Sequence, residues 1–184
     1  PTAAILSPTT GSITNANLIT ISADATDALA GVQAVQFFAG YDPNYGNPLS
    51  VPESQHLRQP PPFNPNAALR QDDLVSPETW DWVQIAWDDN PSDGWGFTWD
   101  ASGIPDQPIS FFIYAYDHAW NYKGTSADGV VVDRTAPESA VYDAYYTTSG
   151  SSASITLWWF GNDNLTGVNY YDIQFSDNGT GWFD

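Results

Sequence analysis

The sequence predicts an all-β protein that folds as a β-sandwich. Short runs rich in β-branched and aromatic residues follow one another, and no stretch has the periodicity of an amphipathic helix. The 14 prolines and 14 glycines supply the turns that a succession of short strands requires. The chain also nearly repeats itself at an offset of 136 residues, which is typical of modular arrays.

Seven strands are expected in the first part of the chain. They lie at residues 3–6, 18–23, 32–38, 80–87, 95–99, 109–116 and 128–132. The second run alternates apolar and polar residues, as a half-buried strand does. The fourth and fifth runs are expected to form a hairpin through a polar loop, with Trp80 and Trp82 on one face and Trp87 on the other. The sixth run is the longest apolar one and predicts a central strand.

The repeat relates the opening of the chain to its end. The turn at residues 27–32 matches the turn at 163–168, in the register that places Ile19 on Ile155. The match begins where Pro1 aligns with Pro137. The end of the chain is therefore interpreted as the opening of a second module.

This interpretation predicts the domain organisation. Residues 1–134 are expected to form one sandwich, residues 135–136 a linker, and residues 137–184 the first strands of a second sandwich. An open half-sandwich exposes apolar side chains and unpaired edges. The side chains concerned are Ile155, Leu157, Ile173 and Phe175. Two explanations stay open: the chain continues beyond Asp184, which is favoured, or a neighbouring subunit supplies the missing strands.

A proline-rich segment at residues 41–77 interrupts the strand pattern. Prolines remove backbone donors from a sheet ladder, so the segment cannot form a sheet interior. Loops longer than about 15 residues in a compact domain are usually functional or disordered. We therefore expect a long insertion between the third and fourth strands.

The net charge of -18 limits the possible partners, since four basic residues oppose 22 acidic ones. An acidic surface repels nucleic acid and anionic membranes and attracts divalent cations. Adaptation to salt or low pH is the alternative explanation of the charge. The absence of cysteine excludes disulfides and thiolate catalysis. No apolar stretch approaches the ~18 residues of a membrane span, so neither nucleic acid binding nor membrane insertion is expected.

Five motifs resemble modules of bacterial surface and secreted proteins. They are the turn before Gly31-Val32, the run 97–100, the turn 116–121, the linker 133–137 and the run 170–177. The first four resemble bacterial Ig-like modules, and the last resembles a strand of a fibronectin type III-like module. The resemblance implies an Ig-like β-sandwich with an insertion, then an incomplete fibronectin type III-like sandwich, in an extracellular or cell-surface protein. Trp120 stands where these families often have glycine.

Acidic turns are candidate calcium sites in such a sandwich, because two of its loops meet at one end. These loops carry Asp24, Asp27, Asp117 and Asn121. A junction between modules would add Asp133 from the linker and Asp163 from the next turn. Calcium takes six to eight hard oxygen ligands, which such loops can supply. The alternative is that each aspartate caps its own turn.

Tryptophans crowd the expected hairpin, and aromatic platforms can stack on sugar rings. Trp80, Trp82 and Trp95 are therefore candidate glycan-binding residues. Core packing is the alternative, because each indole buries a large apolar area. Asn164 and Asn178 begin glycosylation acceptor patterns, which also arise by chance.

The sequence carries no catalytic pattern. His56 and His118 lie in no metal-binding or nucleophile motif, and no phosphate-binding loop is present. We therefore expect a non-catalytic structural or adhesive module of an extracellular multidomain protein, which could form fibres or lattices with neighbouring modules or subunits. The alternative is a carbohydrate-binding accessory module of a secreted glycan-degrading enzyme, with polysaccharide as its partner.

Overall fold

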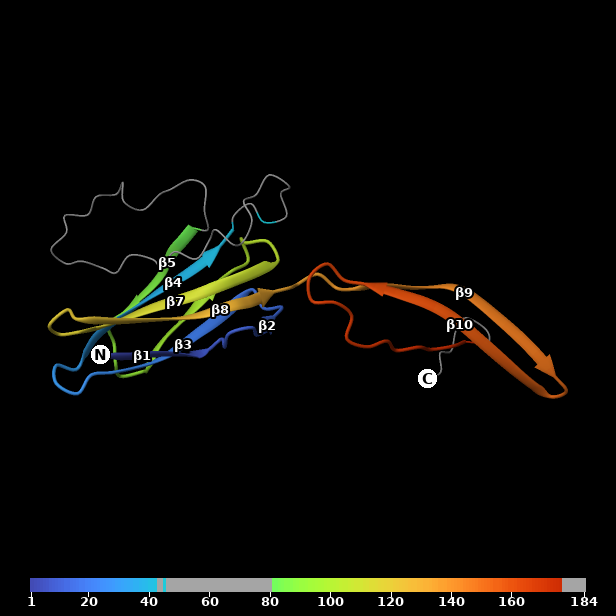
Figure 1. Ribbon diagram of the computed structural model, residues 1–184, viewed down its shortest axis with the longest axis horizontal. Helices are drawn as coiled ribbons and strands as arrows, with labels where there is room; N and C mark the ends of the chain where they lie inside the picture. The colour runs from blue at the N-terminus through green and yellow to red at the C-terminus, as the bar shows by residue number, and fades with distance from the viewer. Residues whose placement is uncertain (43–44, 46–80, 177–184) are drawn as a thin grey trace. The chain divides into compact units, whose positions relative to one another are not determined.

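A computed structural model describes residues 1–42, 45 and 81–176. The chain divides into two compact units, unit 1 at Pro1–Arg134 and unit 2 at Thr135–Asp184. The regular structure of the described residues is all β (Figure 1). The strands are β1 (Thr2–Ser7), β2 (Ile13–Thr14), β3 (Leu18–Thr26), β4 (Val32–Tyr41), β5 (Asp81–Asp88), β6 (Trp95–Asp100), β7 (Gln107–Asp117), β8 (Tyr122–Val132), β9 (Glu138–Ser149) and β10 (Ser152–Asn162).

Unit 1 is a sandwich of two sheets. One sheet has the order β1-β3-β6 and the other the order β2-β8-β7-β4-β5. The core between them is formed by fully buried side chains such as Ile21, Phe37, Phe111 and Ile113. Burial of each such side chain stabilises the fold by about 1.5–3 kcal/mol. The predicted all-β sandwich is confirmed.

The strand positions agree with the sequence pattern, although the predicted hairpin between the fourth and fifth runs is wrong. β5 pairs with β4 and β6 pairs with β3, so the two tryptophan-rich strands belong to different sheets. The polar loop at residues 89–94 therefore crosses between the sheets and does not close a hairpin. Turn residues mark the end of a strand without specifying the next strand's partner, which depends on non-local packing.

A bulge overturns the expected alternation within β5. The register of β5 against β4 steps past Ile85, which is an extra residue. Trp82 and Trp87 consequently lie on the same face of the sheet and pack against one cluster of buried aromatic side chains, Trp82 on Phe112 and Trp87 on Tyr116. Simple alternation placed them on opposite faces.

The outer face of the five-stranded sheet carries a second apolar layer, here called the outer aromatic cluster. Its members are Phe38, Trp82, Trp87, Phe112, Tyr114 and Tyr116. Two glycines leave room for the rings: Gly40 lies under Trp82, and a Cβ atom on Gly124 would lie 2.6 Å from Phe112. Tyr114 and Tyr116 are 1% and 0% exposed, so β7 is buried on both faces. This double burial explains the continuous apolar run that predicts a central strand.

Side-chain hydrogen bonds fix the residue after β4 and the last residue of unit 1. The side chain of Gln107 accepts a hydrogen bond from the Asp42 N–H at 2.8 Å and donates one to the Asp42 carbonyl at 3.1 Å. Arg134, the last residue of unit 1, donates from its guanidinium and its backbone N–H to Asp106 at 3.0 and 2.7 Å. The guanidinium also donates to the carbonyl of Ala101 at 2.9 Å. The chain thus leaves unit 1 from an anchored residue.

Unit 2 contains the antiparallel hairpin of β9 and β10. The third strand expected near residues 173–175 is present only as an isolated bridge at Phe175. Every residue of β9 is exposed, and Ile155 and Phe175 are 64% and 59% exposed. In the part of unit 2 that the structure describes, the sandwich has not closed.

The hairpin of unit 2 repeats the backbone of β1 and β3. Thr2 pairs with Thr26, and Glu138 pairs with Asn162, which are the same positions shifted by the offset of the sequence repeat. Both ladders contain a bulge at the equivalent place, where Leu6 and Tyr142 are the extra residues. The sequence repeat is therefore a repeat of strand register and strand irregularity.

Candidate cation and glycan sites

Asp27 organises the turn that follows β3. Its Oδ1 atom accepts hydrogen bonds from the backbone N–H groups of Leu29 at 3.0 Å and Ala30 at 2.7 Å. Its Oδ2 atom lies 3.0 Å from the amino group of Pro1. The Ala30 N–H, the Pro1 amino group and the Leu29 N–H lower the pKa of Asp27 to about 2. Both carboxylate oxygens therefore have partners within unit 1.

Asp117 organises the turn between β7 and β8 in the same way. Its Oδ1 atom accepts hydrogen bonds from the N–H groups of Ala119 at 2.8 Å and Asn121 at 2.9 Å. Its Oδ2 atom accepts one from the side-chain amide of Asn121 at 2.8 Å. The Asn121 side chain is the largest cause of the lowered pKa of Asp117. Asn121 thus presents its nitrogen, not its oxygen, to the carboxylate.

These two turns meet at one end of unit 1. His118 Nδ1 lies 3.4 Å from the carbonyl oxygen of Gly31, and the charge of Asp27 opposes the lowering of the Asp117 pKa. The structure, over the residues it describes, brings no three His, Cys, Asp or Glu side chains together as a metal site. Calcium binding here stays a prediction, and a melting temperature that falls on adding EDTA would support it.

The other two candidate ligands of unit 1 lie outside these turns. Asp24 belongs to β3 itself and is exposed between buried Ala23 and Ala25, so it is not a loop residue. Asp133 follows β8 at the opposite end of the β7–β8 pair from Asp117, and its N–H donates to the Thr14 carbonyl at 2.9 Å. Strands of this length hold the two aspartates roughly 30 Å apart.

Asp163 in unit 2 reproduces the Asp27 turn. Its Oδ1 atom accepts hydrogen bonds from the N–H groups of Leu165 at 3.0 Å, Thr166 at 2.8 Å and Gly167 at 3.0 Å. These bonds, with that from Leu165 the largest contribution, lower the pKa of Asp163. The geometry matches the turn-capping alternative weighed for these aspartates.

The candidate glycan-binding tryptophans do not form one platform. Trp82 is half-buried in the outer aromatic cluster, whereas Trp95 is half-buried against the core between the sheets. Trp80 lies outside the described residues. The two described tryptophans therefore face different layers of unit 1.

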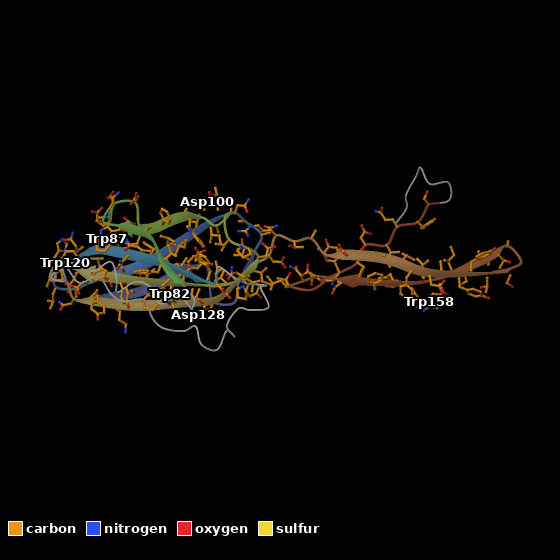
Figure 2. The ribbon with its side chains drawn as sticks, turned by 90° about the horizontal axis from the view of Figure 1, so that it is seen from above. Trp82, Trp87, Asp100, Trp120, Asp128 and Trp158 are labelled. Atoms are coloured by element: carbon orange, nitrogen blue, oxygen red, sulfur yellow. The ribbon has the colours of Figure 1, made fainter. Side chains whose placement is uncertain are left out.

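An exposed aromatic edge at the β7–β8 turn was missed from the sequence. Trp120 is 39% exposed, and its ring centroid lies 6.0 Å from that of Tyr116 and 6.4 Å from that of Trp87 (Figure 2). Tyr122, on the next strand, is 51% exposed and also contacts Tyr116. Trp120 has a φ of 63°, which is costly for a bulky residue. The signal in the sequence was the tryptophan standing where a turn glycine is common.

The remaining predicted features can be placed briefly. Asn164 is exposed in the Asp163 turn, and Asn178 lies outside the described residues. Within the described residues, no helix is long and apolar enough to cross a membrane.

Comparison with known proteins gives one match. Residues 1–53 match the family model of a bacterial Ig domain. No curated protein and no solved structure matches the chain. The matched segment contains β1 to β4, which contribute to both sheets of the sandwich. Modules of this kind are structural parts of multidomain proteins and commonly occur in extracellular or surface proteins.

Proposed function

We propose that unit 1 is a bacterial Ig-like module and that the chain is a non-catalytic structural part of an extracellular or cell-surface protein in which such modules follow one another; the match of residues 1–53 to the bacterial Ig family model supports this. The backbone repeat carries this proposal: unit 2 opens with the ladder, the bulge and the aspartate turn of unit 1. Modules that repeat along a polypeptide suit a spacer that spans distance and transmits tension.

The terminal strands of unit 1 suit a module under tension. β2 runs parallel to the end of β8, and the N–H groups of Val131 and Asp133 donate to the carbonyls of Ser12 at 2.8 Å and Thr14 at 2.9 Å. Tension between the two ends of unit 1 pulls parallel strands in opposite directions. The hydrogen bonds are then loaded together in shear instead of opening one at a time. The contacts of Arg134 with Asp106 add a second attachment beside this strand pair.

Force spectroscopy on unit 1, held at its two ends, tests this role. Val131→Pro removes the N–H that donates to the Ser12 carbonyl of β2. On the β7 side, Val131 pairs in register with Pro108, which has no N–H to donate back to β8. We expect the unfolding force to fall in this variant. Ile21→Val is the control, because it costs about 0.5–1.5 kcal/mol in the core and removes none of the hydrogen bonds between β2 and β8. Equal losses of force in the two variants would argue against a mechanical role.

The proposed location has a separate test. On intact cells, a module at the surface should be cut by added protease and labelled by an antibody against unit 1. A module inside the cell should be neither cut nor labelled. An adhesive role would further require that isolated unit 1 competes with the cells for their binding surface.

The exposed aromatic edge favours carbohydrate binding as a second candidate function. Trp120 and Tyr122 present ring surface beside a rigid layer, in which Tyr116 Oη donates to Gln36 Oε1 at 2.8 Å. Exposed aromatic rings of this kind can stack on sugar rings. Titration with a panel of neutral polysaccharides should then change the tryptophan fluorescence, and Trp120→Ala should abolish the change. A flat titration across the panel would exclude this candidate.

A further inference from the structure

Three polar side chains form a hydrogen-bonded chain across the outer aromatic cluster of unit 1. The Tyr116 hydroxyl donates to Gln36 Oε1 at 2.8 Å, and Gln36 Nε2 donates to Gln84 Oε1 at 2.8 Å. Tyr116 and Gln36 are 0% and 4% exposed, whereas Gln84 is exposed. Polar groups buried among aromatic rings are costly unless they are hydrogen-bonded, so a satisfied chain of this kind holds its members in one arrangement. The exposed amide of Gln84 is therefore held by a buried partner.

This chain determines which end of the Gln84 amide faces solvent. Its Oε1 atom accepts from Gln36 and lies toward the buried side, which leaves the Nε2 group with its two N–H donors on the exposed side. A glutamine on a protein surface usually loses rotamer freedom when it binds a ligand, and this loss weakens binding. At Gln84 the hydrogen bond to Gln36 restrains the side chain before any ligand arrives.

Two indole rings flank this amide on β5. Trp82 and Trp87 are half-buried, and the bulge of β5 brings Trp87 onto the face that carries Gln84. Trp87 stacks on Tyr116, with ring centroids 5.6 Å apart, and its ring centroid lies 6.4 Å from that of Trp120 (Figure 2). Bulges that re-aim a side chain are over-represented next to active sites. The restrained amide therefore lies beside a row of aromatic rings.

Trp120, in the turn beside this row, combines exposure with backbone strain. It is 39% exposed and has a φ of 63°. Glycine adopts this conformation at almost no cost, so the turn itself does not require an indole. Residues held in costly backbone conformations cluster at ligand-binding sites. The strained, exposed ring and the restrained amide thus point to a ligand on the same face of the five-stranded sheet.

We propose that Gln84 is the specificity-determining residue of a neutral-glycan site on this face, where its Nε2 group donates to a sugar oxygen and the indoles of Trp87 and Trp120 supply stacking surface. The inference rests on the carbohydrate-binding candidate function proposed above. Stacking alone discriminates little between sugars, whereas a fixed donor rejects a sugar that places no oxygen opposite it. The net charge of -18 disfavours acidic polysaccharides, and none of the three side chains is charged at neutral pH.

Calorimetric titration of the complete chain tests the site, with soluble β-glucan, glucomannan and arabinoxylan as neutral probes and polygalacturonate as the acidic one. The unchanged chain should bind at least one neutral probe and should not bind polygalacturonate. Gln84→Ala should weaken that binding by about twofold to tenfold, as expected for the loss of one hydrogen bond. Val83→Ala is the matched control: Val83 pairs with the core residue Ala39, so it lies on the other face of β5, and binding should persist.

Gln84→Glu separates the outward donor from the buried contact. It keeps an acceptor for Gln36 Nε2 and replaces the two outward N–H donors by a carboxylate oxygen, so it should weaken binding at least as much as Gln84→Ala. Thermal denaturation should show both variants folded, because the side chain is exposed.

The outcomes distinguish this inference from the candidate function on which it rests. Unchanged affinity in Gln84→Ala and Gln84→Glu, or an equal loss in Val83→Ala, would overturn the role of Gln84 and leave carbohydrate binding through the aromatic rings intact. Flat titrations of the unchanged chain with all neutral probes would overturn the inference together with the carbohydrate-binding candidate. The structural role proposed for unit 1 depends on neither result.

Discussion

The β1–β3 pair of unit 1 and the β9–β10 hairpin of unit 2 have the same ladder and opposite burial. Both pairs share their register and their bulge, and each is followed by an aspartate turn with a glycine at positive φ, 71° at Gly31 and 78° at Gly167. Ile21 is nevertheless fully buried, whereas its counterpart Leu157 is not. Pairing, bulge and turn are thus determined within about thirty residues of sequence, while burial depends on a facing sheet built from distant strands.

The largest expected effect separates these two equivalent positions. Ile21→Ala leaves a cavity in the core of unit 1 and should lower its free energy of unfolding by about 2–5 kcal/mol. Leu157→Ala should leave the stability of unit 1 unchanged, because that side chain belongs to unit 2. Urea denaturation followed by tryptophan fluorescence measures both. Equal losses in the two variants would mean that the units unfold as one and would remove the basis of the comparison.

A smaller effect is expected where unit 1 anchors its last residue. Arg134→Ala removes the ion pair with Asp106 and the bond to the Ala101 carbonyl, and should destabilise unit 1 by about 1–3 kcal/mol. Arg134→Lys keeps the charge but loses the planar fork, so part of the loss should remain. Thermal denaturation of the three proteins provides the measurement. Identical melting temperatures would show that the anchor contributes nothing to stability.

The turn between β7 and β8 gives a prediction of about 1 kcal/mol. Trp120 has a φ of 63°, a conformation that costs a residue with a Cβ atom roughly 1–2 kcal/mol and glycine almost nothing. Trp120→Gly should therefore be more stable than Trp120→Ala, although glycine is the more flexible residue. Both variants lose the ring contacts with Tyr116 and Trp87, so the difference between them isolates the backbone term. The reverse order of stability would contradict the assigned backbone conformation.

The sequence predicted the parts of this fold that depend on local pattern. Strands appeared where apolar and β-branched residues cluster, and the apolar run at 109–116 is indeed the central strand β7. The partner of β5 was not predictable from its turn, because β4 and β6 compete for it from different sheets. The bulge at Ile85 reverses which residues of β5 face the core, and no residue type in the strand predicts that bulge. The outer aromatic cluster escaped notice because a run buried on both faces has no alternation to interpret.

For the acidic turns too, local sequence determines the turn itself, whereas a cation site depends on residues distant in sequence. Asp27 and Asp163 were identified from the repeat, and each caps its own turn. Whether such turns also bind a cation depends on oxygens contributed by other loops, which the spacing of residues along one chain does not specify. The sequence could therefore locate the aspartates without determining what else surrounds them.

The smallest expected effect compares these two aspartates through their pKa values. The pKa of Asp27 is lowered from 3.8 to about 2, so the folded state favours the ionised form. Its contribution to stability is present above pH ~3.8 and is lost as the pH falls towards 2. Asp27→Asn should flatten the pH dependence of the unfolding free energy of unit 1 in this window, measured by urea denaturation. Asp163→Asn should leave that dependence unchanged, since Asp163 belongs to unit 2.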